Sequence, residues 1–514
     1  MPTSDANTSA LAFRQESTYG VLPASPQFRR LRLTGETFGH AKETITSGEI
    51  RQDRQVPDMA EVGSSATGGF GFELSFLAFQ PFLEALLCGT ITEYNFAATS
   101  GDFDASSSTF TATTPGDLTG IPIGGFVKIS GATATGNNGL KRVISNDGDV
   151  LTFAAGAITD DDTGETVDIY AKDLRNGVVR RSYTFEREIE NSVGAKIYQT
   201  YPGCYIGEGS INVESKQIIT GDFGVLGKFG QTSSTSLNTA SLVAATGTLT
   251  LVANPADGDT CTIGTRTYTF QTTLTNVAGN VFIGAAATNT LDNLIAAINL
   301  AAGAGTTYAA ATTAHPTVSA AAGTGDTMDI TADTAGTAGN AIVTTETFTN
   351  VGNVFGAATL TGGTAHAYLA AQTGDILNGT SNLGTIQGTN GTFTDKLRML
   401  AFAVTNNLRG KDALGELGNF EVGLGRFGVT GSISAYFADN TLYQALIDHD
   451  DNAIGITLTD SDGNSVAFTF PRIKWGTGNP NATAIDTDIM LDIDFTAILD
   501  PVTGVTMIVN FFPA

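Results

Sequence analysis

Residues 423–428 read GLGRFG and match the G-x-G-x-x-G spacing of sites that bind dinucleotides. In such a site a strand precedes the glycines, and the helix that follows turns its N-terminus towards the pyrophosphate. Here the chain continues as VTGSISAYF, whose alternation of apolar and small residues predicts a strand instead of a helix. We therefore interpret these glycines as bulges or as places where strands approach closely, and we predict no nucleotide site.

Two acidic stretches have residue types that could bind a metal ion. DHDDN at 448–452 places His449 among aspartates, but it stands between a predicted helix and the predicted strand AIGITLTD, which indicates a solvated turn. TDSDGNSV at 459–466 resembles the start of a calcium-binding loop, but FTFPR follows where the ligand at the twelfth position is needed. Alternation on both sides of that stretch predicts a hairpin turn centred on Asp462 and Gly463. No metal site is predicted.

Histidine and cysteine provide no group that would make a persuasive catalytic pair or metal site. The four histidines are scattered along the chain, at His40, His315, His366 and His449. The cysteines lie far apart, at Cys88, Cys204 and Cys261, and neither their number nor their spacing predicts a disulfide framework or a zinc site. We expect buried or free thiols in a reducing cytoplasm, no cofactor and no enzymatic activity.

Charge and composition restrict the classes of function further. The chain of 514 residues is 41% hydrophobic and only 15% charged, which is typical of a globular protein of about three domains. Its formal net charge of -25 opposes binding to a polyanion, because affinity for DNA comes mainly from Lys and Arg. No apolar run approaches the ~20 residues that span a bilayer, and the N-terminus lacks the features of a signal peptide. We expect a soluble chain made in the cytoplasm.

One unit, a strand followed by a helix, occurs twice in the sequence. In residues 69–90, GFGFELSFLAFQPFLEALLCGT, the aromatic residues alternate with small or polar ones up to Phe76, which predicts a half-buried strand. A helix is then expected from Gln80 and Pro81 to Gly89, because proline favours the first turn of a helix and glycine ends it.

The second copy is GRFGVTGSISAYFADNTLYQALIDH at 425–449. Asp439 is predicted to cap its helix. Its buried strand face is predicted from Phe427, Val429, Ile433 and Phe437, and its helical stripe from Leu442, Tyr443, Leu446 and Ile447. A further likeness between the segments that begin at Tyr183 and at Leu400 indicates a duplicated core.

Shifts in composition divide the chain into five segments. Residues 95–175 carry short alternating stretches (STFTAT, GGFVKIS, KRVIS) with turns expected at 146–148 and 162–164, which predicts a small all-β module. Residues 237–379 are rich in Ala, Gly and Thr, with a hairpin expected in GDTCTIGTRTYTF and a helix in TNTLDNLIAAINLAAGAG. We interpret both as modules inserted into one discontinuous core formed by 1–94, 176–236 and 380–514.

The core segments resemble a known family. The stretch from Thr8 to Gly89 is similar to the N-terminal half of the tail tube protein of long, flexible-tailed (siphovirus-like) bacteriophages. The marks are ESTYG at 16–20, PASP at 23–26, RLRLTGE at 30–36, SGEIRQDR at 47–54 and FQPFLEAL at 79–86. The second strand-and-helix copy resembles the C-terminal half of that family, and both inserts resemble modules found in virion proteins.

The resemblance implies a mainly β fold: a sandwich or barrel core with short flanking helices, discontinuous in sequence, with two small inserted domains. It also implies a structural subunit of the virion tail, which is assembled in the host cytoplasm. Copies of this subunit are expected to form rings, hexameric by the resemblance, that stack on one another. Its partners would be copies of itself and other tail proteins (tape measure, terminator and tip), with no membrane. Phage DNA would pass through the hollow tube without specific binding, because an acidic wall of small residues offers it no attachment.

Two sets of residues are assigned to this assembly as predictions. The faces opposite Phe72 and Ile433 are small or polar, which predicts contact with a water-filled bore for Glu73, Ser75, Ser432 and Ser434. The ring interface is predicted at the N-terminal arm, before Phe38, and in an ion-paired loop that contains Glu49, Arg51, Asp53 and Arg54. Two alternatives stay open: a surface-layer or pilus-type subunit, and an adhesive virion protein whose inserts bind glycans. The sequence leaves open whether the inserts decorate the tube or help its rings to stack.

Overall fold

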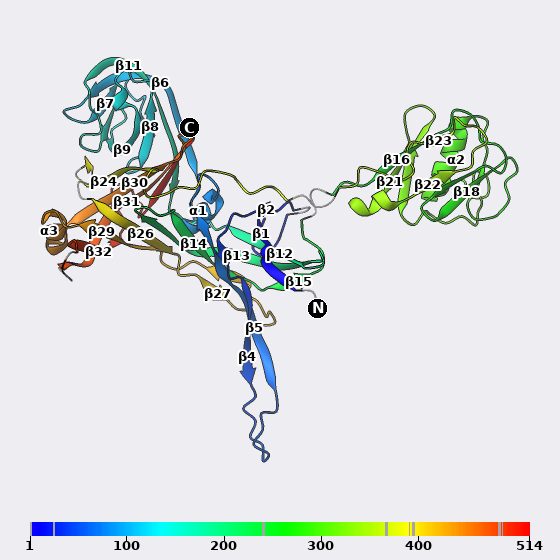
Figure 1. The fold of residues 1–514 in the computed structure, drawn as a ribbon, viewed down its shortest axis with the longest axis horizontal. Helices are drawn as coiled ribbons and strands as arrows, with labels where there is room; N and C mark the ends of the chain where they lie inside the picture. The colour runs from blue at the N-terminus through cyan, green and yellow to red at the C-terminus, as the bar shows by residue number, and fades with distance from the viewer. Residues whose placement is uncertain are drawn as a thin grey trace. The chain divides into compact units, whose positions relative to one another are not determined.

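The computed structural model describes residues 3–23, 26–238, 242–364, 368–389, 391–392, 396–481, 485 and 487–514. The described chain is mainly β, with 49% strand, 7% helix and three short α-helices, which confirms the predicted fold class. It divides into two compact units (Figure 1). The first contains residues 1–23, 29–235 and 370–514, and the second contains residues 24–28 and 236–369.

A sheet of six neighbouring strands forms the centre of the first unit. In spatial order these are β5 (Met59–Glu73), β14 (Thr220–Gly227), β13 (Lys196–Glu214), β26 (Leu397–Thr405), β29 (Gly428–Tyr436) and β32 (Met490–Ala497). All five pairings are antiparallel. The strands alternate between buried apolar and exposed polar residues, and this period of two gives the sheet one face in the core and one in solvent.

Further strands continue this sheet on both sides. Beyond β32 and behind the sheet lie β24 (Leu383–Gly388), β25 (Gly391–Thr392), β30 (Asp451–Thr459), β31 (Ser465–Asn481) and β33 (Ile508–Phe512). Around β5 and the first half of β13 lie β1 (Ser4–Gln15), β2 (Arg29–Arg30), β3 (Gly35–Glu36), β4 (Gly39–Thr46), β12 (Ser182–Asn191) and β15 (Gln231–Ser233). A separate pair, β27 (Arg409–Lys411) and β28 (Glu421–Gly423), completes this part.

The two predicted helices pack where the strand-and-helix pattern expects them. Helix α1 (Gln80–Leu86) has Pro81 in its first turn and buries Phe82, whose ring lies 5.1 Å from that of Phe70 and 4.7 Å from that of Phe13. Helix α3 (Thr441–Asp448) packs against β31. Both helices therefore cover apolar faces of strands. The aromatic cluster around Phe82 contributes a large buried area to the core.

Two details of the second copy differ from the prediction. The residue that caps α3 is Asn440 instead of Asp439, although the Asp439 carboxylate accepts a hydrogen bond from the Thr441 amide at 2.8 Å. Ile447 is 59% exposed, and Leu442 is the buried residue of the helix. The helix is only two turns long, so its last turn extends beyond the edge of the core instead of lying on it.

Residues 92–175 close a six-stranded barrel. Its strands are β6 (Thr92–Asp104), β7 (Thr109–Ala112), β10 (Val150–Phe153), β9 (Gly139–Asn146), β8 (Phe126–Ser130) and β11 (Asp162–Arg175), and β11 pairs with β6 to complete the ring. A short 3-10 helix, η1 (Thr135–Asn137), precedes β9. The barrel has its own apolar core around Phe110, Val127 and Leu151. The closed ring of strands thus lies in the segment that the composition marks as an all-β module.

The turn predicted at 162–164 is wrong, because these residues begin strand β11. Gly164 has a φ of +69°, and the register between β11 and β6 shifts between Asp162 and Glu165. The glycine therefore serves a β-bulge, which needs the same left-handed backbone conformation as a turn.

The second unit consists of two four-stranded sheets and one helix. One sheet has the order β20 (Val318–Ala322), β21 (Thr327–Ala332), β16 (Thr246–Thr250), β23 (Val354–Phe355). The other has the order β19 (Asn280–Phe282), β18 (Arg266–Gln271), β17 (Thr260–Ile263), β22 (Thr344–Glu346). The predicted hairpin corresponds to β17 and β18, and the predicted helix to α2 (Ala287–Asn299), which buries Leu291, Leu294 and Ile298. A 3-10 helix, η2 (Thr337–Ala341), lies before β22.

Candidate functional site

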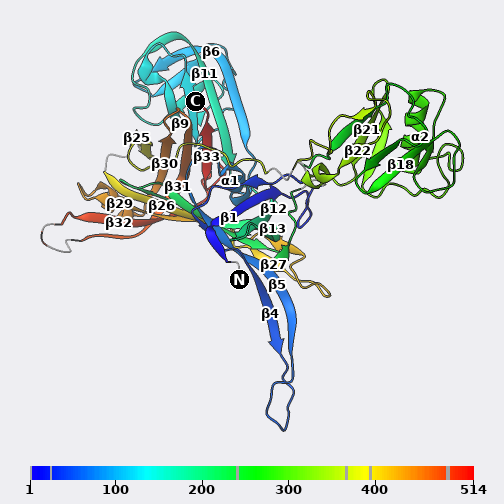
Figure 2. The same cartoon turned by 45° about the vertical axis from the view of Figure 1, so that its right-hand side comes forward.

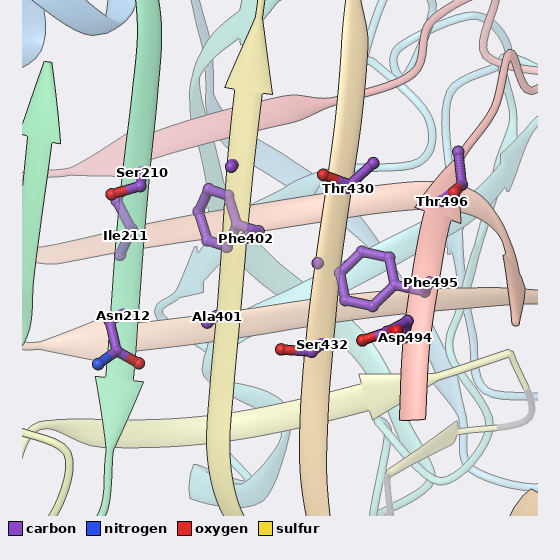
Figure 3. Close-up of a pocket in the computed structure, with 12 residues that line it drawn as sticks. Ser210, Ile211, Asn212, Ala401, Phe402, Thr430, Ser432, Asp494, Phe495 and Thr496 are labelled. Atoms are coloured by element: carbon purple, nitrogen blue, oxygen red, sulfur yellow. The ribbon is translucent and has the colours of Figure 1, made fainter. Parts of the chain in front are cut away.

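The solvent-facing side of the six-stranded sheet β5-β14-β13-β26-β29-β32 carries polar side chains in register from strand to strand. One row runs Gly71, Asp222, Ser210, Ala403, Thr430, Thr496, and the next runs Glu73, Thr220, Asn212, Ala401, Ser432, Asp494. Figure 3 shows Ser210, Thr430 and Thr496 across the first row and Asn212, Ala401, Ser432 and Asp494 across the second. Four of these strands line a shallow depression of about 540 Å³. We call this surface the polar face.

Small residues and carboxylates make up the polar face. Its six carboxylates are Glu73, Glu208, Glu214, Asp222, Asp492 and Asp494. Residues 208–214 of β13 and the residues paired with them across β26, β29 and β32 include no Lys or Arg. Arg398 lies in the bulge beside Met399, at one end of β26. Because the side chains are short and the charges have one sign, the surface is smooth and repels anions.

The opposite side of the same strands is apolar and tightly packed. The rings of Phe72 and Phe223 stack with centroids 4.9 Å apart, and Phe402 and Phe495 are 4% and 1% exposed. Gly431 stands between these last two, and a Cβ atom there would lie 2.4 Å from the Phe495 ring. The phenylalanine therefore covers the glycine, and the polar side chains across the sheet are held on a rigid support.

The structure brings three of the four predicted bore residues into the rows of the polar face: Glu73, Ser432 and Ser434, of which Ser434 is only 8% exposed. Ser75 lies beyond the end of β5, where it is 3% exposed and forms an isolated bridge with Ile376. The other five carboxylates, on β13, β14 and β32, were not predicted from the sequence. The alternation in MLDIDFTA, with aspartates at every second position, is the signal that could have found Asp492 and Asp494.

A long hairpin extends from one end of the sheet (Figure 2). Strands β4 and β5 pair from Gly39–Thr67 out to Thr46–Met59, and residues 47–58 form the tip. Along the hairpin Ile45, Ile50, Val56 and Met59 are 60% to 99% exposed. Apolar side chains so exposed on a projecting hairpin are typical of a contact surface.

The predicted interface residues all lie at this tip. Arg51 binds Asp53 with two hydrogen bonds, of 3.1 Å and 2.8 Å, and this bond lowers the pKa of the Asp53 carboxyl. Arg54 has a φ of +59°, and its side chain has no hydrogen-bond or ion-pair partner in the described part of the chain. Glu49 donates only its backbone amide, to Ser47 at 3.4 Å. The loop therefore contains one internal ion pair and one free cation.

The segment expected as an N-terminal arm forms strand β1 and is fastened to the core. Leu11, Ala12 and Phe13 are buried against β12. Strand β1 ends at Gln15, and the buried carboxylate of the next residue, Glu16, accepts hydrogen bonds from two amides and two hydroxyls. A carboxylate with four donors is well satisfied in the core.

The patterns that could have supported other chemistry have structural roles. GLGRFG leads into strand β29, DHDDN spans the end of α3 and the start of β30, and Asp462 and Gly463 form the β30–β31 turn. His40, His315 and His449 lie apart, and His366 is outside the described residues. Among the residues described, no group of three or more His, Cys, Asp or Glu side chains is placed to hold a metal ion. The described helices include none with the length and apolarity to cross a membrane.

Comparison with known proteins identifies a family. The model of a family described as phage tail tube protein matches residues 6–292, which is more than half of the chain. No curated protein matches the sequence.

Proposed function

The chain belongs to the phage tail tube proteins, and from that premise we propose that its polar face lines the bore of a tube built from stacked rings. The family is one of structural, typically non-enzymatic proteins of the virion tail. The finer statement, that copies of this chain form hexameric rings through which DNA leaves a siphovirus-like particle, is our proposal.

The acidic, cation-poor polar face carries this proposal. DNA has one negative charge for about each 1.7 Å of helix axis, and proteins that hold it do so with Lys and Arg. A wall with six carboxylates for each subunit and short side chains across six strands gives DNA neither a cation nor a projecting group to bind. We therefore assign Glu73, Ser432 and Ser434, together with Asp492 and Asp494, to the bore, and we place Ser75 outside it.

Assembly into rings is supported by the hairpin and by the outer edge of its strand β4, which pairs only with β5 among the described strands. A sheet with free edges in one chain is a template for pairing with another, and a ring of copies removes this hazard. The tip at 47–58, with its exposed apolar side chains, is the proposed contact between rings, and the barrel at 92–175 is proposed to stay clear of the bore. The tape measure, terminator and tip proteins of the tail are the proposed further partners.

Electron microscopy of the purified chain at rising concentration tests the proposal. Hollow tubes with an acidic bore are expected. Flat lattices would instead favour a surface-layer subunit, and discrete oligomers that bind glycans would favour an adhesive protein. A protein that remains monomeric at high concentration refutes the tube.

Charge reversal at the tip tests the ring contact itself. The double variant R51E/R54E removes the internal ion pair and the free cation, and we expect it to polymerise poorly, because two like charges replace a complementary pattern. The matched control is R426E, which changes an exposed arginine away from the tip. Normal tubes from R51E/R54E would remove the tip from the interface.

A further inference from the structure

A groove lies at the base of the β4–β5 hairpin. Its walls are Glu43 of β4, residues 62–65 of β5, Leu226 of β14 and the segment 410–419, and its volume is about 380 Å³. The Ser64 amide donates a 2.6 Å hydrogen bond to the Leu417 carbonyl, and this contact holds the segment against the hairpin. The groove is therefore a built feature of the fold with a backbone link across it.

The groove combines carboxylates with exposed aliphatic side chains. Neither Glu43 nor Asp412 has a hydrogen-bond or ion-pair partner for its carboxylate within the described ranges, and Glu416 has only a 3.7 Å contact with Lys228. Val62 and Leu417 are 46% and 55% exposed although they line the same groove. An occupant that satisfies these groups carries a cation flanked by aliphatic residues.

The tip of the hairpin has this composition. Arg54 is its free cation, and Ile50 and Val56 on either side are 99% and 67% exposed. Arginine suits such a contact, because its guanidinium can bind a carboxylate with two hydrogen bonds and is weakly hydrated.

A chain cannot place its own tip in its own groove. Nine residues separate Glu43 from the centre of the tip, and at about 3.3 Å for each residue of a strand the two sites lie roughly 30 Å apart. The occupant must come from another molecule. We propose that the groove receives the hairpin tip of a second copy of this chain, with Arg54 of one copy facing Asp412 and Glu43 of the next. The inference deepens the proposed function and rests on it, because a head-to-tail contact of this kind repeats without closing.

A charge-swap series tests the pairing. R54E alone and D412R alone should each raise the protein concentration needed for polymerisation by at least about tenfold, because like charges then face each other. The double variant R54E/D412R should restore polymerisation to within about threefold of the wild type. The controls R426E and D117R make the same charge changes at exposed positions outside the tip and groove and should polymerise normally.

Disulfide trapping tests the geometry independently of charge. The native cysteines Cys88, Cys204 and Cys261 are all buried, so a new pair of surface cysteines is observed without background. I50C/L417C tubes, oxidised and separated on a non-reducing gel, should give a ladder of covalent oligomers, and each single variant should give at most a dimer. Reduction should collapse the ladder to monomer.

The outcomes separate the two proposals. Rescue by R54E/D412R together with a ladder from I50C/L417C supports the groove as the receiving site. Three results would each overturn the groove and leave the tube proposal intact: normal tubes from either single reversal, no recovery of polymerisation in the double variant, or I50C/L417C protein that stays monomeric on the non-reducing gel. Wild-type protein that forms no tubes overturns the proposed function, and the groove with it.

Discussion

Placing lysines on the polar face should slow the passage of DNA without affecting the fold. We choose T430K/D492K, because both side chains are exposed on neighbouring strands and the core lies on the other side of the sheet. Two ammonium groups then join five carboxylates, so the net charge of the six-stranded surface changes from about -6 to about -3. The control T113K/D117K makes the same two substitutions on the exposed surface of the barrel.

The size of the effect follows from simple electrostatics. In water, two unit charges at about 10 Å attract by about 0.4 kcal/mol, and physiological salt screens this to roughly a third. If a ring contains six copies, twelve ammonium groups face the DNA, which gives on the order of 1–5 kcal/mol for each ring. Since 1.4 kcal/mol is a factor of about ten, DNA release should slow at least about fivefold, and the slowing should diminish as salt is raised.

The assay measures the rate at which virions carrying each variant release DNA into a buffer with a fluorescent DNA dye, at several salt concentrations. Tail length by electron microscopy verifies that tubes assemble. The assignment of this surface to the bore would be refuted if T430K/D492K virions with tails of normal length released DNA as fast as wild type and T113K/D117K virions. An equal slowing in T113K/D117K would refute it too, because the barrel is proposed to lie away from the DNA.

Three further predictions concern the support of this surface. G431A should lower the free energy of unfolding by about 1–3 kcal/mol, because its Cβ would collide with Phe495 and the Ala401 carbonyl. The control is G428A in the same strand, whose Cβ would approach the Thr405 methyl group at 3.4 Å. Denaturant titration of both variants separates the packing effect from the general effect of replacing a glycine. Glu188 is buried, which acts to raise its pKa, but its bonds to Lys196 and Arg30 outweigh burial and lower it. The stability from this carboxylate is therefore present above its unfolded pKa of about 4.5 and is lost as pH falls through the lower folded value. The E188Q variant should be less stable than wild type by about 1–2 kcal/mol at pH 7, and the difference should shrink progressively below pH 4.5. Thermal denaturation of both proteins across pH measures this difference. Burial raises the pKa of the Cys88, Cys204 and Cys261 thiols, so a thiol reagent at pH 8 should leave all three unmodified in the native protein and modify three in denaturant; rapid native labelling would contradict their packing.

Local pattern was enough to predict the elements whose faces are decided by their own residues. Phe70, Phe72 and Leu74 are buried as their alternation predicts, and the helix after Pro81 starts where the proline places it. The hairpin turns at 146–148 and 462–463 follow from residues that favour positive φ. The same signal gave the wrong result at Gly164, because a bulge and a turn need the same backbone conformation and only the partner strand distinguishes them.

The order of the strands could not be derived from such patterns. Strand β14 lies between β5 and β13, so residues near 70, 210 and 222 become neighbours although about 140 residues separate the first from the others. The polar face exists only through this order, and the carboxylates of β14 and β32 have no signal in the sequence that relates them to Glu73. Glu73 beside Phe72 and Ser432 beside Ile433 lie on the solvent side of the sheet, as alternation predicts. Ser75 shows that alternation fails as soon as a strand ends, and Ser434 is only 8% exposed.

The relation between the two sides of the sheet explains why the same six strands suit both roles. A bore needs short side chains at every position that faces DNA, but a wall of short side chains has little apolar surface of its own with which to stay folded. The large residues are therefore placed on the reverse side, where Phe72, Phe223, Phe402 and Phe495 pack against the helices and the second layer of strands. Because alternate residues of a strand point to opposite sides, each added phenylalanine in the core leaves the adjacent positions free to be Ser, Thr or Asp without loss of packing. Stability and a smooth acidic surface are thus independent properties of one sheet, which is why charge on the polar face should change DNA passage while a single methyl group at Gly431 should change folding.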